Sequence, residues 1–534
     1  MRRAVLATTA VMMAATLTGG WAAQRADIRP EGGGKTGKAG RTQKAGETAA
    51  EARGAELAAR RAAEKGIDWK DCGNDSPLQC GIVTVPVDYA EPDGRTIGIA
   101  VDRYPSGGTK EQRQGSLLLN PGGPGAPGGD VPLSTARKPV WKKVTAAYDL
   151  IGFDPRGVGF SAPVSCVDPQ QHAKAPRPDP VPHSEADKQQ AHERARNYAQ
   201  GCKDRTGDLL RHIDTPDTAR DMDVIRAALG EKKLNYLGYS YGTYLGAVYG
   251  TLFPGHVRRM VLDSVVNPSN VWYENHRAQV PAFERRFGEW KEWVARHDGT
   301  FHLGGTADEV GERLEKLMAQ ARREPIGGKA GPYELTQMFM MTMYSDGNWV
   351  PDTTAWSEYE AGRPDGLVEK ATGGPMSENF TAAYTAVDCN DAPWPRDPER
   401  WDRDAERQHE RHPFLAWFSQ RMNLPCASWP EPSRTPVDVR TREGLPPVLI
   451  VQNEGDAATP VEGAAELHRR FRDSGMITVR GEGQHIASDT PNPCVNSRVD
   501  GYLLRGDLAD RDVSCAAPPQ PEPPGAHRPA AAGR

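Results

Sequence analysis

The sequence lacks several features that would point to common classes of protein. Its 66 lysines and arginines are balanced by 71 aspartates and glutamates, giving a net charge of -5. This leaves no basic surplus that would predict nucleic acid as a partner. The apolar stretch at the N-terminus is too short, and too rich in Thr and Gly, for a comfortable membrane span. We therefore expect neither nucleic-acid binding nor stable membrane association, and the sequence leaves the oligomeric state open.

The sequence also lacks the cysteine patterns of metal and redox sites. It contains no CxxC pair and no Cys/His cluster at zinc spacing, so we expect no metal and no cofactor. Its eight cysteines form an even set, which favours disulfides in an exported protein. Many pairings are possible, and we favour bonds between neighbours in the sequence. These would be Cys72 with Cys80, Cys166 with Cys202, Cys389 with Cys426, and Cys494 with Cys515.

The two ends of the chain differ in composition from the rest. Residues 1–23 have the charged start, apolar middle and small-residue end of a signal peptide, which predicts a secreted, extracellular protein. No cysteine lies there for lipid attachment. Residues 24–66 are rich in Gly, Ala, Lys, Arg and Glu, which predicts a linker, a propeptide or a solvated helix. Residues 517–534 are predicted to be a disordered, proline-rich tail.

Strand and helix patterns alternate through the first half of the remaining chain. Short apolar runs that end at turn residues predict strands over 115–120, 147–154 and 257–266. Between the last two, residues 215–229 have the pattern of a helix, with Thr215 as N-cap. Such alternation predicts an α/β fold with a mostly parallel central sheet.

A serine flanked by glycines follows a further predicted strand. The stretch is "LNYLGYSYGTYLG", with Gly238 and Gly242 on either side of Ser240. Such flanks can arise by chance. They are also typical of a nucleophile elbow, a tight strand-to-helix turn that exposes the serine hydroxyl at the carboxyl end of a strand. Because Ser240 follows a strand and precedes a helix of small and apolar residues, we favour the elbow.

A serine nucleophile needs a histidine base and an acid that orients it. Asp456 and His485 each follow directly after a predicted strand, in the order acid then histidine. We predict that these two residues complete a catalytic triad with Ser240. Glu454 is the alternative acid, although it stands earlier in the same turn.

The same chemistry requires backbone amides that stabilise an oxyanion. One amide is expected from Tyr241, directly after the nucleophile, and the other from the glycine turn "NPGGPG". We choose Gly123 in that turn, with Gly122 close behind. The alternative is a plain loop whose glycines only permit positive φ angles.

Five motifs in this order carry a resemblance to a known family: "NPGGPG", "DPRGVGFS", "GYSYGTYLG", "EGDAATP" and "GEGQHI". The chain resembles the secreted tripeptidyl aminopeptidases of the α/β-hydrolase superfamily, relatives of the prolyl iminopeptidases, from about residue 67 to 515. The resemblance implies an α/β-hydrolase fold, with Ser240 as nucleophile, Asp456 as acid and His485 as base. Prolyl iminopeptidases typically have His where Asn120 stands, which argues against that narrower activity.

A long insert of amphipathic helical stretches separates the nucleophile from the acid. We predict a hydrolase core over 67–266 and 431–516, with a helical lid over 267–430. The apolar stripes of the insert, such as Trp290 and Trp293, are more typical of a core than of a ligand pocket. A lid of this kind can cap a pocket and restrict hydrolysis to chain ends.

The sequence therefore predicts a secreted serine exopeptidase that acts on peptide or protein N-termini and releases tripeptides or other short peptides. An esterase or other acyl hydrolase with the same triad is the first alternative, and a binding protein without catalysis is the second. A free α-amino group is largely a cation at neutral pH, so lid carboxylates are expected to bind it. Asp388 and Asp391 are the candidates, although both could simply cap turns beside Pro393.

Overall fold

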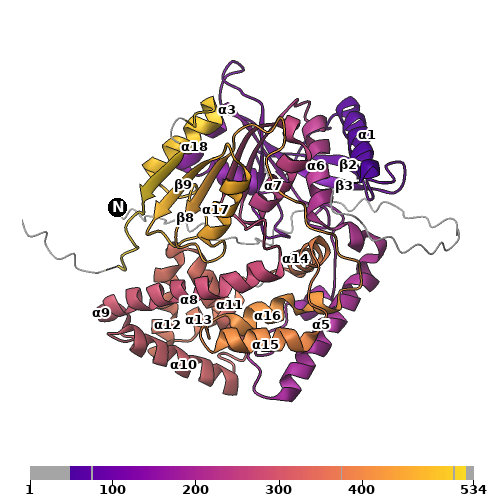
Figure 1. The fold of residues 1–534 in the computed structure, drawn as a ribbon. Coiled ribbons are helices and arrows are strands. Elements are labelled where there is room, and N and C mark those ends of the chain that lie inside the picture. The colour runs from indigo at the N-terminus through magenta and orange to yellow at the C-terminus, as the bar shows by residue number, and fades with distance from the viewer. Residues whose placement is uncertain (1–47, 74–75, 375, 509–510, 525–534) are drawn as a thin grey trace, which may run out of the picture.

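The computed structural model describes residues 48–73, 76–374, 376–508 and 511–524 (Figure 1). The predicted signal peptide, residues 24–47 of the predicted linker and residues 525–534 of the predicted tail lie outside these ranges. Among the described residues, no helix has the length and apolar character needed to cross a bilayer.

One sheet of ten strands forms the core of the described chain. The strands are β1 (Lys70–Asp71), β2 (Gln79–Pro86), β3 (Thr96–Tyr104), β4 (Ser116–Asn120), β5 (Asp149–Phe153), β6 (Leu234–Tyr239), β7 (Val257–Asp263), β8 (Leu449–Asn453), β9 (Gly475–Arg480) and β10 (Asp512–Ala516). Their order is β1-β2-β3-β5-β4-β6-β7-β8-β9-β10. The strands β4 to β10 are parallel to their neighbours among one another. Strand β3 is antiparallel to both β2 and β5, and β1 is antiparallel to β2. This is the α/β-hydrolase fold, and it confirms the predicted fold class.

Helices cover both faces of the sheet, because the side chains of each strand alternate between two apolar cores. Leu118 of β4 belongs to the core under α6 and α7, whereas Leu117 and Leu119 belong to the core under α3 and α18. The helices of these layers are α2 (Val131–Ala136), α3 (Lys142–Ala147), α6 (Thr215–Ala228), α7 (Tyr241–Leu252), α17 (Val461–Arg470) and α18 (Pro493–Arg505). The 3-10 helices are η1 (Pro139–Trp141), η2 (Gly207–His212), η3 (Pro254–His256), η4 (Asp346–Asn348) and η5 (Leu424–Ser428).

The stretch predicted as a linker or solvated helix contains a helix that packs on the core. Helix α1 (Ala49–Lys65) begins with a capping box in which Thr48 and Glu51 bond each other. It buries Ala55 completely, and a Cβ at Gly54 would lie 1.8 Å from the carbonyl oxygen of Tyr89. A linker or a solvated helix is therefore wrong for residues 49–65, and a propeptide stays a prediction. Small residues allow the backbones to approach closely, so this helix needs no large apolar side chain.

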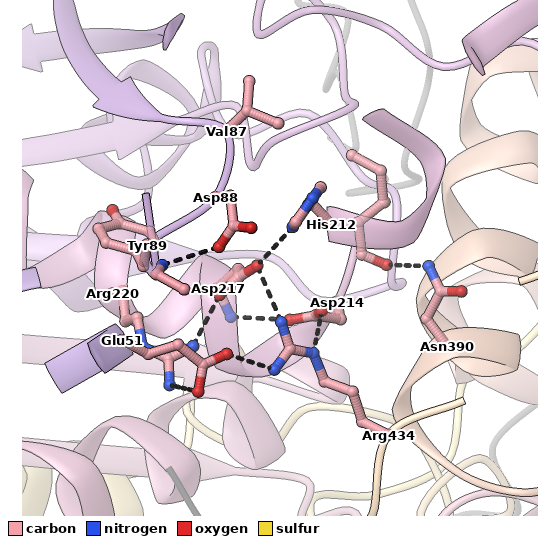
Figure 2. Close-up of polar contacts among 12 residues, drawn as sticks. Glu51, Val87, Asp88, Tyr89, His212, Asp214, Asp217, Arg220, Asn390 and Arg434 are labelled. Carbon is pink, nitrogen blue, oxygen red and sulfur yellow. Dashed lines mark hydrogen bonds and ion pairs between the residues drawn. The ribbon is translucent and has the colours of Figure 1, made fainter. Parts of the chain in front are cut away.

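A network of charged side chains joins α1 to α6 and to the segment that returns from the cap (Figure 2). The guanidinium of Arg434 donates to Glu51 at 2.9 Å, Asp214 at 2.5 Å and Asp217 at 3.1 Å. Arg220 contacts Asp217 at 2.6 Å. Burial alone would raise the pKa of Asp217, but the surrounding cations hold it well below its usual range. Asp217 is therefore ionised, and the arginines stabilise its charge.

A helical cap lies below the sheet in Figure 1 and comes mostly from the chain between β7 and β8. Its helices are α8 (Tyr273–Arg296), α9 (Asp298–Phe301), α10 (Ala307–Arg323), α11 (Pro332–Tyr344), α12 (Trp349–Glu360), α13 (Asp365–Thr372), α14 (Glu378–Asp391), α15 (Pro398–His409) and α16 (Ala416–Asn423). The predicted stripe of Trp290 and Trp293 lies inside an apolar core of this layer. The division of the chain at residues 266 and 430 stays a prediction.

Residues outside the insert also join the cap layer. Helices α4 (Pro169–His172) and α5 (Glu185–Thr206) come from the chain between β5 and β6. Lys188 of α5 donates to Glu406 of α15 at 2.6 Å. Helix α5 is therefore distant in sequence from the insert but bonded to it.

The four disulfides join the predicted sequence neighbours: Cys72–Cys80, Cys166–Cys202, Cys389–Cys426 and Cys494–Cys515. The last of these ties β10 to α18. Beyond β10, the described part of the tail crosses to the cap, where Trp293 Nε1 donates to the carbonyl oxygen of Pro521 at 2.9 Å. Arg296 donates to Gln520 at 2.6 Å. The prediction of a disordered tail is therefore wrong for residues 517–524.

Candidate active site

Ser240 stands in a sharp turn between β6 and α7. Its φ of 55° lies in the left-handed region, which non-glycine residues rarely adopt. A Cβ at Gly238 would lie 2.4 Å from the carbonyl oxygen of Gly242, and one at Gly242 would lie 2.7 Å from Oδ1 of Asn120. Side chains at both flanking positions would clash, so the glycines are a steric requirement of this turn. The geometry is that of a nucleophile elbow.

Asp456 and His485 lie together in the loops after β8 and β9. Nδ1 of His485 is 2.8 Å from Oδ2 of Asp456 and 3.1 Å from Oδ1. The carboxylate is fully buried and also accepts bonds from the backbone of Ala458 and from Thr459. These bonds hold the carboxylate in place, so it can orient the imidazole with the proton on Nδ1 and leave Nε2 as the acceptor.

The alternative acid lies elsewhere. Glu454 accepts a hydrogen bond from the backbone of Gly481 at 3.0 Å, in an exposed position. Only Asp456, of these two acids, bonds the imidazole of His485. Both acids follow β8 and precede His485, so their place within the turn distinguishes them.

The Nε2 atom of His485 is buried and makes no hydrogen bond within the described ranges. The backbone amide of the same residue donates to the carbonyl oxygen of Tyr344 at 2.8 Å, and the two rings meet edge to face at 5.3 Å between centroids. Tyr344 ends α11, so the cap contacts the histidine directly. This contact was not predicted, because nothing in the sequence pairs α11 with the loop after β9.

The glycine turn after β4 lies against the elbow. A Cβ at Gly122 would lie 2.9 Å from Cβ of Ser240 and 3.2 Å from the amide nitrogen of Tyr241. The amide of Gly122 donates to Oδ1 of Asn120 at 3.0 Å, whereas no hydrogen bond from the amide of Gly123 is found in the described part of the chain. Tyr241 is the first residue of α7, where amides have no partner inside the helix. The amides of Gly123 and Tyr241 are therefore available to a ligand.

Asp388 and Asp391 both lie in α14 rather than in a turn, and both are buried. Asp391 accepts bonds from the amide of Thr215 at 2.7 Å, from its hydroxyl at 2.5 Å and from Trp272 at 3.3 Å. Asp388 bonds Nε2 of His276 through Oδ2 at 2.8 Å, while its Oδ1 has no partner among the described residues. The alternative that these aspartates cap turns is therefore wrong.

Burial dominates the protonation of these two acids. It raises the pKa of Asp391 to about 8, with the charge of Asp214 acting in the same direction. Burial also raises the pKa of Asp388, although His276 opposes this shift. Asp391 is therefore largely protonated at neutral pH.

Thr215 connects Asp391 to the residue after the nucleophile. Its hydroxyl lies 2.8 Å from the phenol oxygen of Tyr241 as well as bonding Asp391. Thr215 was predicted as the N-cap of the helix that follows, but Asp214 takes that place and accepts from the amide of Asp217. Either residue type can cap a helix, so local sequence alone could not decide which one does.

One group of potential metal ligands is found among the described residues, formed by Cys72, Cys80 and Asp102. Both thiols are joined in a disulfide, which leaves a single carboxylate. The disulfide-bonded group therefore lacks the ligands that a metal would need.

Comparison with known proteins agrees with the geometry. A family model described as "TAP-like protein" matches residues 412–515. The chain is 55% identical over 487 residues to a tripeptidyl aminopeptidase of Streptomyces coelicolor, covering 89% of this chain and 90% of that protein. Two relatives from Mycobacterium tuberculosis are serine protease Hip1, 31% identical over 84% of this chain and 91% of that protein, and carboxylesterase B, 33% identical over 82% and 86%. The chain belongs to the tripeptidyl aminopeptidase family.

Proposed function

We propose that this protein is a secreted serine aminopeptidase that releases tripeptides from free N-termini through an acyl-enzyme on Ser240. The observation that carries the proposal is the buried pair of Asp456 and His485, in which Nε2 of His485 makes no hydrogen bond within the described ranges. Both residues follow strands of the same parallel sheet as Ser240, which stands in the nucleophile elbow. The 55% identity to a tripeptidyl aminopeptidase supports the substrate class. Four disulfides in the described chain are consistent with an extracellular location.

The proposed reaction proceeds in two halves. Nε2 of His485 takes the proton of the Ser240 hydroxyl while Oγ attacks the carbonyl carbon, and the amides of Tyr241 and Gly123 stabilise the oxyanion. The C–N bond breaks as His485 returns the proton to the leaving amine, which leaves an ester on Ser240. A water molecule then loses its proton to His485 and attacks the ester, and the serine leaves with that proton.

A serine-directed phosphonate tests the nucleophile. We expect the reagent to label Ser240 and abolish turnover, and the label is located by mass spectrometry of peptides. Ser240→Ala is expected to lower kcat by about 10⁴- to 10⁶-fold, with residual activity from the oxyanion hole. Ser165, a hydroxyl far from the elbow in sequence, serves as control through Ser165→Ala. A label on another serine would contradict the assignment.

We further propose that α14 recognises the free amino group of the substrate. Asp388 is the better candidate of the two acids, because one oxygen of its buried carboxylate is unpaired while both oxygens of Asp391 accept bonds. An ammonium bound there would pair with a partly desolvated charge, which a blocked N-terminus leaves unpaired.

Chromogenic tripeptides with a free or an acetylated N-terminus test this recognition. We expect Asp388→Asn to lower kcat/KM on the free peptide by about 10- to 100-fold and to remove most of the preference for it, as for loss of one charged hydrogen bond. Asp391→Asn is the matched control in the same helix. If both variants keep the wild-type preference, the amino group is bound elsewhere.

An esterase is the second candidate, because one relative of this chain is named carboxylesterase B. The same triad would hydrolyse an ester by the same two halves. If the wild-type protein cleaves simple esters but neither of the two tripeptides, the esterase takes the place of the aminopeptidase.

A further inference from the structure

Asp263 ends β7, the strand between those that precede the nucleophile and the acid, and Ser264 directly follows it. β7 pairs with β6 on one side and with β8 on the other, so its carboxyl end lies between the ends that carry Ser240 and Asp456. Both residues of the pair are fully buried. Neither was singled out from the sequence, although the predicted strand over 257–266 contains both.

The side chains of this pair hold the three amides that follow His485. Ser264 Oγ accepts from the amide of Ile486 at 2.8 Å. Asp263 Oδ1 accepts from the amide of Ala487 at 3.0 Å, and Oδ2 accepts from the amide of Ser488 at 2.7 Å and its hydroxyl at 2.5 Å. The carboxylate therefore bonds the backbone of the histidine loop, whereas the imidazole is bonded by Asp456.

The backbone of the same pair holds the elbow and the next strand. The carbonyl oxygen of Asp263 accepts from the amide of Ser240 at 3.0 Å, and the amide of Ser264 donates to the carbonyl oxygen of Val451 in β8 at 2.9 Å. One dipeptide thus bonds both the loop of the base and the turn of the nucleophile.

Two further facts indicate that this arrangement is constrained. Ser264 has a φ of 63° and Ile486 a φ of 70°, so the two residues that share a hydrogen bond both occupy the left-handed region. Non-glycine residues persist there when the surrounding structure holds them. Burial raises the pKa of Asp263 to about 6, which leaves the carboxylate mostly ionised at neutral pH and able to accept all of these bonds.

We propose that Asp263 and Ser264 are positioning residues, which set the placement of His485 relative to Ser240 by bonding the loop of one and the turn of the other. The inference rests on the proposed function. Proton transfer needs hydrogen-bond reach between base and nucleophile, and a misplacement of about 1 Å can cost about 100-fold in rate.

The test compares variants of the pair with a buried acid elsewhere in the sheet. Asp263→Asn replaces one acceptor oxygen with a donor that would face an amide of the loop. Ser264→Ala is the milder change, because Ala and Ser share the same steric cost at positive φ. Asp149→Asn is the control, since this buried acid of β5 also accepts from a backbone amide, that of Ser106.

We measure thermal unfolding, kcat and KM on a free chromogenic tripeptide, and the rate at which a phosphonate labels Ser240. We expect Asp263→Asn to lower kcat and the labelling rate by about 10- to 100-fold, with KM within about twofold, because only the reacting geometry changes. Ser264→Ala should lower both by a smaller factor. Asp149→Asn should keep both rates while it lowers the melting temperature.

Three outcomes overturn the inference. Asp263→Asn and Ser264→Ala could both be labelled as fast as wild type, both could raise KM without lowering kcat, or Asp149→Asn could lose as much kcat as Asp263→Asn. A wild-type protein that the phosphonate does not label at Ser240 would instead refute the proposed function.

A His485→Ala background gives a second test. If the pair acts through His485, adding Asp263→Asn to that background lowers kcat by less than about twofold. A loss of kcat as large as the one in the wild-type background would contradict a positioning role.

Discussion

Ser240 occupies a strained turn because its flanking residues have no side chains to clash. The sequence could predict this, since two glycines at fixed spacing after a strand have a direct steric meaning. The contact between Asp456 and His485 was predictable for another reason, because each residue follows a strand of a parallel sheet. Asp263 and Thr215 were not, since their contacts join loops that are far apart in the chain.

Asp391 supplies a prediction about pH. Its pKa is raised by burial to about 8, against about 3.9 in an unfolded chain. Between these values the folded protein holds a proton that the unfolded chain releases. The contribution of Asp391 to the free energy of unfolding is therefore fully present below about pH 4 and is lost as the pH rises through about 8. Over this range the free energy of unfolding falls by at most about 1.4 kcal/mol per pH unit.

Asp391→Asn imitates the protonated acid, so we expect it to flatten the pH dependence of stability between about pH 4 and 8. Denaturant unfolding at a series of pH values measures the effect. Asp438→Asn, at an exposed acid, is the control and should keep the wild-type slope. An unchanged slope in Asp391→Asn would show that Asp391 is ionised in the folded protein at neutral pH.

Among the elements, helix α1 shows best why part of the fold could not be predicted. Its buried face consists of alanines, a glycine and Glu51, which a hydrophobic pattern does not distinguish from the face of a solvated helix. The contact depends on the close approach of Gly54 to Tyr89, and on Arg434, which lies far along the chain. Strands β4 to β9 were predictable, because continuous apolar runs between turn residues are typical of buried parallel strands.

The bonds of Arg434 yield a prediction about stability. Arg434→Ala would leave Glu51, Asp214 and Asp217 without a shared cation, and its side chain is only 23% exposed. Removing one partner of a buried ion pair lowers the free energy of unfolding by about 3 to 5 kcal/mol. Because Arg434 is partly exposed, we expect a loss of about 3 kcal/mol for Arg434→Ala.

Urea unfolding of Arg434→Ala measures this loss. Arg440→Ala removes an arginine that is 53% exposed, and is expected to change the free energy of unfolding by less than about 0.5 kcal/mol. Equal effects of the two substitutions would mean that the network around α1 contributes nothing beyond a surface ion pair.

At the scale of the whole molecule, the parallel sheet brings the loops after β4, β6, β7, β8 and β9 to one edge, and the cap faces that edge (Figure 1). The sequence predicted this edge because alternating strands and helices indicate a parallel sheet, whose strands end at the same edge. It could not predict how the cap is held. The contact of Tyr344 with His485, the bond from Trp293 to Pro521 and the place of α5 beside α15 all depend on tertiary packing.

Removal of tripeptides from free N-termini through Ser240 can be measured directly. A nonapeptide and its acetylated twin are incubated with the wild-type protein, and the products are followed by mass spectrometry over time. We expect the free peptide to lose its N-terminal tripeptide first and then the next one, the acetylated twin to stay intact, and Ser240→Ala to cleave neither. Cleavage of the acetylated twin at a similar rate, or a first product other than the tripeptide, would contradict a tripeptidyl aminopeptidase.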